Sequence, residues 1–256
     1  MKNMILKIIL SLFSISLIVS NETLGIVTKS KGKVEYQKYS DDRFTDNIYR
    51  GLGLYGDDRI RTGDSGFSVY RYLDDASSIK ILKNSDIRIE GRVKSRNIIK
   101  NVEVNNGILN FNIDKQADAG FTIVTPTSIA TVKGTDFWLI CNGPEGDKFF
   151  GVEGSVEIKN IESGRVVLLN EDAIVLSTSN GNILSQNMTT QDLEQIEDLE
   201  EESGDYNNLD IDTGFDDGSN QDEDISSDSD ISSDNIIRIQ LEDSLGNLKE
   251  LIIKYK

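Results

Sequence analysis

Hydrophobic and polar residues alternate with a period of two along most of the first three quarters of the chain. The clearest stretches are residues 33–37, 78–82, 86–90, 102–104, 108–113, 121–124, 136–140, 156–158 and 165–169. Successive side chains of a strand point to opposite faces, whereas a helical stripe repeats every 3.6 residues. The pattern therefore predicts many short strands that each bury one face.

Turn-forming residues separate these stretches at short intervals. The candidate turns are Gly63–Gly66, Asp74–Asp75, Asn105–Gly107, Gly143–Gly146 and Glu162–Gly164. Many short strands with regular turns are typical of a sandwich, a barrel or a β-solenoid. We therefore expect one all-β domain over residues 24–188, a length that suits a single core.

The first 20 residues resemble a secretory signal peptide. Lys2 and Lys7 precede an apolar run from Ile8 to Val19, and small or polar residues follow it. The run of about 12 residues is shorter than the roughly 20 that span a bilayer. We expect cleavage after Ser20, or as late as Gly25, no stable membrane span afterwards, and an extracytoplasmic location, either periplasmic or secreted.

The acidic residues are concentrated in the predicted linker, residues 189–234. Eighteen acidic residues and no basic residue lie between Gln191 and Asp234, in a chain of net charge -17. Such a composition buries too little apolar surface to offset the entropy of ordering, so we expect the linker to be disordered. A short helix near Gln191 to Glu202 is expected at its start. The tract would repel phosphates, and nucleic acid is therefore not an expected ligand.

The last segment, residues 235–256, is apolar again. Two alternating runs surround a turn at Gly246-Asn247, a pattern that predicts a β-hairpin. Because a lone hairpin is marginal in water, we expect it to dock on the main domain or on a partner.

The composition excludes most catalytic chemistry. The chain has no histidine and one cysteine, Cys141, which rules out Ser-His-Asp and Cys-His mechanisms, zinc sites that use imidazole and an intramolecular disulfide. Cys141 follows an apolar stretch and is expected to be a buried hydrophobe.

Carboxylate pairs are the remaining acid-base candidates, at Asp57-Asp58, Asp64 and Asp74-Asp75. Adjacent acids in a strand point to opposite faces, and acids in turns usually cap or solvate. The acidic residues 210–218 lack the ligand spacing of a complete calcium loop. We therefore expect no catalytic residue, no cofactor, no metal and no enzymatic activity.

Several strings resemble the FecR-domain family. They are Gly32–Tyr36, Gly56–Gly63, Asp75–Ile79, Asn84–Ile87, the long Thr-Pro-x-x-x-Ala-x-Val-x-Gly-Thr-x-Phe string at Thr125–Phe137, and Val152–Val156. The resemblance extends over roughly residues 25–181 and implies an extracytoplasmic β domain. Signalling members of the family also carry a cytoplasmic segment that controls a sigma factor and a membrane helix. Here the β domain follows the predicted signal peptide directly, so neither that route of signalling nor iron-transport regulation is implied.

Two functions remain open. The domain could bind an envelope or secreted protein through an exposed strand edge, or it could bind or build cell-envelope polysaccharide. A row of exposed aromatics would favour sugar, and the candidates are Trp138, Phe149, Phe150 and Tyr36, Tyr39, Tyr49, Tyr55, Tyr70 and Tyr72.

Three basic residues, Arg59, Arg61 and Lys133, are the candidate partner-binding residues. Arg59 and Arg61 should share one strand face, opposite Ile60. An ordinary solvated face and a contact with the acidic linker are the alternative interpretations of this pattern.

Overall fold

The computed structural model describes residues 22–94, 97–116, 120–205, 235–242 and 248–255. The predicted signal peptide and most of the predicted acidic linker lie outside these ranges. The chain divides into two compact units, Met1–Asp210 and Ile211–Lys256, which are considered separately.

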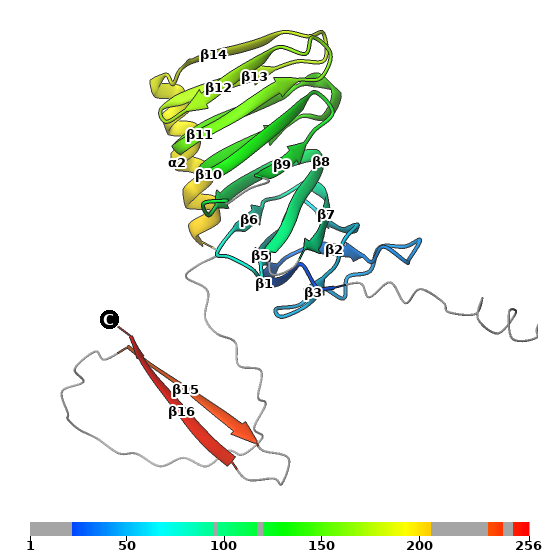
Figure 1. The fold of residues 1–256 in the computed structure, drawn as a ribbon, viewed down its shortest axis with the longest axis vertical. Helices are drawn as coiled ribbons and strands as arrows, with labels where there is room; N and C mark the ends of the chain where they lie inside the picture. Colours follow the sequence, from blue (N-terminus) through cyan, green and yellow to red (C-terminus); the bar gives the residue numbers. More distant parts are fainter. Residues whose placement is uncertain (1–21, 95–96, 117–119, 206–234, 243–247, 256) are drawn as a thin grey trace, which may run out of the picture. The chain divides into compact units, whose positions relative to one another are not determined.

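The first unit is built from strands that stack from β1–β3 at one end to β12 and β14 at the other (Figure 1). Its elements are β1 (Gly25–Lys31), β2 (Val34–Gln37), β3 (Gly53–Leu54), β4 (Asp58–Thr62), β5 (Phe67–Tyr72), β6 (Ser78–Ile81), β7 (Asp86–Lys94), β8 (Asn97–Ile113), β9 (Phe121–Val124), β10 (Ser128–Cys141), a 3-10 turn η1 (Gly143–Glu145), β11 (Asp147–Asn160), β12 (Val166–Asn170), β13 (Ala173–Ser177), β14 (Ile183–Asn187) and α2 (Thr190–Asp205).

These strands form one 14-stranded sheet that folds over on itself. The long strands β8, β10 and β11 change partners along their length: β10 pairs with β9 through residues 129–132 and with β8 through residues 135–141. The change falls at a register shift that contains Gly134, whose φ of 144° favours glycine. The described strands form no closed barrel, and the all-β prediction is confirmed.

Both halves of the folded sheet face one apolar core. Phe111 of β8 stacks on Phe137 of β10 with ring centroids 5.2 Å apart, and Phe121 of β9 meets the edge of Tyr72 at 5.6 Å. All four rings are fully buried. The period-two pattern of the sequence produces this core, since each strand contributes alternate side chains to it.

The turn predicted at Asn105–Gly107 is wrong, because β8 runs unbroken through these residues. Gly107 instead permits close packing: a Cβ added there would lie 2.2 Å from Oγ of Ser85. The Ser85 hydroxyl donates to the carbonyl of Leu82 at 2.8 Å. Here glycine marks a crowded strand position and not a reversal of the chain.

A helix begins where the sequence predicts one near Gln191. The Thr189 amide donates to Asp192 Oδ2 at 2.9 Å and the Asp192 amide donates to Thr189 Oγ1 at 3.3 Å, which caps the helix start. Ile196 and Leu199 are buried in a second apolar cluster, together with Phe67, Leu82, Trp138, Phe150 and Ile174 of the sheet. The packed unit therefore continues beyond Met188 through α2. None of the helices in the described ranges has the length and hydropathy to span a bilayer.

The second unit contains β15 (Asn235–Glu242) and β16 (Leu248–Tyr255), which pair antiparallel. Their register runs from Asn235 opposite Tyr255 to Glu242 opposite Leu248. The expected hairpin is thus present in the backbone.

Candidate functional site

Arg59 and Arg61 lie on the same face of β4, as their spacing predicts, and share one carboxylate. Arg59 Nη2 lies 2.9 Å from Asp86 Oδ1, and Arg61 Nη2 lies 3.0 Å from Asp86 Oδ2. The Phe44 ring lies 5.4 Å from the Arg59 guanidinium carbon and 4.1 Å from that of Arg61. Both cations therefore pair with Asp86 within the fold, although the Arg59 Nε atom is buried without a hydrogen-bond partner.

Lys133 lies elsewhere. It is exposed on β10, within the register shift between Val132 and Thr135, and no strand pairing joins β10 to β4. The structure therefore brings Arg59 and Arg61 together without Lys133, and a role for the three residues at a partner surface remains a prediction.

The first pair of candidate acids organises a loop. Asp58 is fully buried and accepts hydrogen bonds from the Tyr36 hydroxyl at 2.8 Å and from the amides of Tyr39 and Tyr55 at 2.9 Å. Burial, together with the hydrogen bond to Asp58, raises the pKa of Tyr36. Asp57 occupies the left-handed region at φ 69°. Asp57 and Asp58 therefore fix the turn that leads into β4, the strand that forms most of the Gly56–Gly63 string.

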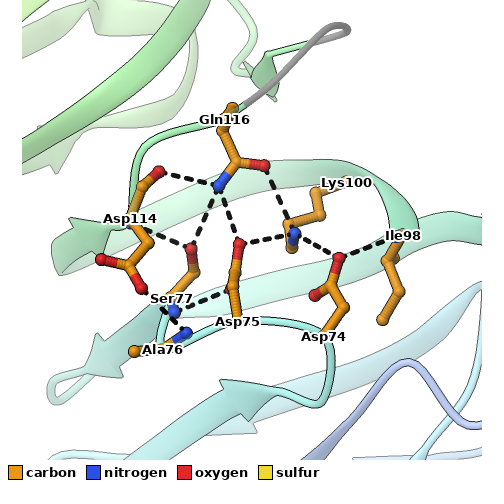
Figure 2. A network of polar contacts seen from close by, with 8 residues as sticks. All are labelled: Asp74, Asp75, Ala76, Ser77, Ile98, Lys100, Asp114 and Gln116. Atoms are coloured by element: carbon orange, nitrogen blue, oxygen red, sulfur yellow. Dashed lines mark hydrogen bonds and ion pairs between the residues drawn. The ribbon is translucent and has the colours of Figure 1, made fainter. Parts of the chain in front are cut away.

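Asp74 and Asp75 surround a buried lysine (Figure 2). Lys100 is 1% exposed, and its Nζ lies 2.8 Å from one carboxylate oxygen of each aspartate. Gln116 Nε2 donates to Asp75 at 2.8 Å, and Gln116 Oε1 accepts from Lys100 at 3.3 Å. Burial alone would raise the pKa of Asp75, but hydrogen bonds from Lys100 and Gln116 lower it overall. Both acids are ion-pair partners of one lysine, not an acid-base couple facing substrate.

The string Thr125–Phe137 begins with a buried cluster of hydroxyl groups. Thr125 Oγ1 and Ser128 Oγ donate to Asp147 Oδ2 at 2.5 and 2.7 Å, and Thr127 Oγ1 donates to the same oxygen. Cys141 is buried, as predicted, and burial raises the pKa of its thiol to about 12. A thiol held neutral in this way is structural rather than nucleophilic.

The aromatic candidates do not form an exposed row in the described part of the chain. Trp138, Phe149 and Phe150 are buried, as are Tyr36, Tyr70 and Tyr72. Tyr55 is half-buried, and Tyr39 and Tyr49 are exposed in the segment between β2 and β3. This arrangement does not provide the stacking platform that sugar binding would use.

An unprotected strand edge is present at the opposite end. Among the strands that the structure describes, β14 pairs only with β13, and β12 pairs only with β11. Two hydrogen bonds of 2.9 Å, from Thr178 N to Asn182 O and from Met188 N to Asp172 O, lie at the two ends of the β13–β14 ladder. They show which residue pairs of the ladder are hydrogen-bonded, because such pairs alternate along antiparallel strands. Antiparallel alternation then directs the backbone groups of Ile183, Ser185 and Asn187 away from β13.

The side chains of β12 and β14 are uncharged, and three large apolar ones among them are exposed. Val166, Leu168 and Leu184 are 51%, 50% and 55% exposed, and Ser185 Oγ donates to Leu168 O at 3.4 Å across the two strands. Neither strand contains a charge or a proline, the residues that usually block edge pairing. We call the backbone edges of β12 and β14, with these three apolar side chains, the open edge.

The residues of the open edge are not among the candidate residues that the sequence pattern indicates. A signal was present, because Val166–Asn170 and Ile183–Asn187 are uncharged runs bounded by turn residues. Sequence patterns do not show which strand is the last in a sheet, so these runs resemble those of the interior.

Comparison with known proteins identifies the domain. Residues 58–157 match the family model for the FecR protein, and no curated protein matches. Two crystal structures of a proposed anti-sigma factor from Parabacteroides distasonis ATCC 8503 are each 20% identical with a TM-score of 0.45. The 2.50 Å structure aligns over 53% of this chain and 62% of that chain, and the 1.65 Å structure over 57% and 74%. The family model falls on the strings that organise Asp58, Asp86 and Asp147, and residues 58–157 therefore resemble a FecR domain.

Proposed function

We propose that this protein is an exported, non-enzymatic FecR-domain protein that binds an envelope or secreted protein through the open edge. The observation that carries the proposal is the pair of uncharged strands with outward backbone groups and exposed Val166, Leu168 and Leu184. An extended segment of a partner can add to such an edge through main-chain hydrogen bonds, while alternate side chains give specificity. A signal-sensing role is compatible with this form of binding.

Two further observations support binding without catalysis. Of the candidate acids, Asp74 and Asp75 pair with Lys100 and Asp58 accepts from backbone amides, and the aromatic rings are largely buried. These features favour a protein ligand over a polysaccharide and provide no nucleophile.

The test is capture from an envelope extract of the source cells. The full mature chain is compared with the double variant Leu168→Lys/Leu184→Lys, which adds charge to the open edge. Tyr39→Lys/Tyr49→Lys is the matched control, because these two exposed residues belong to the segment between β2 and β3. We expect the wild type and the control to capture the same protein and the edge variant to lose it.

Equal capture by all three chains would place the binding surface elsewhere and refute the edge. Retention of all three on cell-wall or exopolysaccharide, without a captured protein, would replace the proposal with the polysaccharide function.

Export is part of the proposal, and the fold bears on the cleavage position. Leu24 is buried and its amide donates to Leu54 O at 2.9 Å, while Gly25 pairs with Leu54 and Tyr72. Cleavage after Gly25 would remove these contacts, whereas cleavage after Ser20 would keep them. Intact-mass measurement of the exported protein should therefore give a chain that retains Leu24.

A further inference from the structure

The charges of the first unit are divided unevenly along its sequence. Residues 22–149 contain 19 basic and 18 acidic residues, whereas residues 150–205 contain two basic and 13 acidic residues. The second range includes β12, β13, β14 and α2. Eight of these 13 acidic residues lie on α2, which runs back along the stack: Asp192 pairs with Lys148 and Glu202 pairs with Lys83 (Figure 1). The negative charge that a partner meets at the open edge therefore comes from the carboxylates beside β14 and not from the whole range.

Carboxylates lie beside both ends of β14. At its start, a Cβ added to Gly181 would lie 3.6 Å from Cγ of Glu162. At its end, Met188 N donates to Asp172 O at 2.9 Å, and Glu171 precedes Asp172 in the chain. Glu162, Glu171 and Asp172 are exposed, and none has an ion-pair partner among the described residues.

The open edge between these carboxylates is neutral. The five residues of β14 extend about 17 Å at the usual rise of a strand. Ile183, Ser185 and Asn187 direct their backbone groups outward, and Leu184 supplies an apolar side chain. A complementary ligand would carry positive charge near both ends of a short, uncharged strand.

We propose that the partner segment is a cationic β-strand, with Lys or Arg at both ends and uncharged, alternately apolar residues between them, that pairs with β14. This inference rests on the proposed function, because it specifies the ligand of the same open edge. A second copy of the chain does not fit this chemistry, since edge-to-edge pairing would bring two ends with the same excess of acid together.

The experiment measures binding of synthetic peptides to the full chain by fluorescence anisotropy. The probe is a labelled Lys-Thr-Val-Thr-Val-Thr-Lys peptide, and the controls replace both Lys by Glu or the central Thr by Pro. We expect the Lys peptide to bind, the Glu peptide to bind at least about tenfold more weakly, and the affinity for the Lys peptide to fall as salt rises.

Two protein variants locate the site. The amide of Ser185 points away from β13 and makes no ladder hydrogen bond to it. Ser185→Pro removes this amide from the free edge and should therefore weaken peptide binding about tenfold, with Ser185→Thr as the matched control. Glu162→Gln/Glu171→Gln/Asp172→Asn should weaken binding about fivefold and flatten the salt dependence. Asp42→Asn/Asp46→Asn/Asp64→Asn removes three exposed carboxylates from residues 22–149 and should leave both unchanged.

The outcomes separate the two proposals. Equal binding of the Lys and Glu peptides, lost in Ser185→Pro, would keep the open edge as a strand-binding site and overturn the cationic ligand. Binding of the Lys peptide that Ser185→Pro does not affect would overturn pairing with β14. Failure of every peptide, with envelope capture still sensitive to Leu168→Lys/Leu184→Lys, would reject this ligand alone. Dimerisation in sedimentation that Ser185→Pro abolishes would identify a second copy as the occupant.

Discussion

The strand edges at the two ends of the first unit differ: one is covered and the other is open. At the β2 end, Thr45 exchanges backbone hydrogen bonds of 2.7 and 2.8 Å with Tyr36, and Phe44 covers Arg59 and Arg61. At the β14 end, uncharged strands leave outward backbone groups and exposed leucines. Natural sheets usually block their edges, so an edge that is left open at one end while the other is covered is the basis on which we propose an interaction surface there.

The ends also differ in how their charges are used. In the range before residue 150, several charges are paired within the fold, as Lys100 is with Asp74 and Asp75. In the range after it, exposed carboxylates such as Glu162 and Glu171 have none among the described residues. The first arrangement stabilises the fold, whereas the second is free to act on a ligand.

The largest expected effect comes from Lys100→Met. The change leaves two carboxylates without their cation in a site where Lys100 is almost inaccessible, and should lower the free energy of unfolding by about 3–5 kcal/mol. Urea denaturation followed by Trp138 fluorescence measures it. Lys133→Met is the control, because Lys133 is exposed, and Asp74→Asn/Asp75→Asn should partly rescue Lys100→Met. A cost below about 1 kcal/mol would mean that the network contributes little.

The second effect concerns the arginine cluster. Arg59→Gln/Arg61→Gln removes both cations from Asp86, whose side chain is 12% exposed, and should cost about 1–3 kcal/mol. Because both arginines pair with Asp86 within the domain, envelope capture should persist. Arg71→Gln is the exposed control for stability. Loss of capture with intact folding would restore the arginines as a partner surface.

A smaller effect links α2 to pH. The hydrogen bond from Lys148, at 2.6 Å, and those from Thr189 lower the pKa of Asp192 to about 2. The folded-state pKa is depressed from 3.8, so the stabilisation is complete above about pH 4 and is lost as the pH falls to about 2.

Thermal unfolding of the wild type and Asp192→Asn should therefore differ at pH 6, by about 0.5 kcal/mol, and converge near pH 2. Asp198→Asn is the control, because Asp198 is exposed on the same helix. A difference between wild type and Asp192→Asn that stays constant across this range would exclude the ion pair as its source.

The smallest effect on stability is expected at the open edge. Leu184→Lys should change the free energy of unfolding by less than about 0.5 kcal/mol, since the side chain is 55% exposed. The same chemical denaturation, with Tyr49→Lys for comparison, measures it. A cost above about 2 kcal/mol would show that Leu184 packs in the folded protein and would contradict an open edge.

Local pattern was sufficient for much of the fold. The alternation predicts the all-β class, and the turns at Gly63–Gly66 and Glu162–Gly164 lie between strands as expected. The turn predicted at Asn105–Gly107 was wrong because glycine occurs both in turns and at closely packed strand positions. Only the proximity of Ser85 shows that close packing applies at Gly107. The candidate acids were identified by residue type, but type does not reveal that Lys100 lies between Asp74 and Asp75.

The sequence by itself determined the strand-rich class, the FecR strings, the helix near Gln191 and the shared face of Arg59 and Arg61, because these depend on neighbours along the chain. The tertiary structure decided which strands are last in the sheet, and hence that Val166, Leu168 and Leu184 are exposed. It also decided that Arg59 and Arg61 are paired with Asp86. Edge position and charge pairing arise from contacts between residues distant in sequence, which no local period encodes.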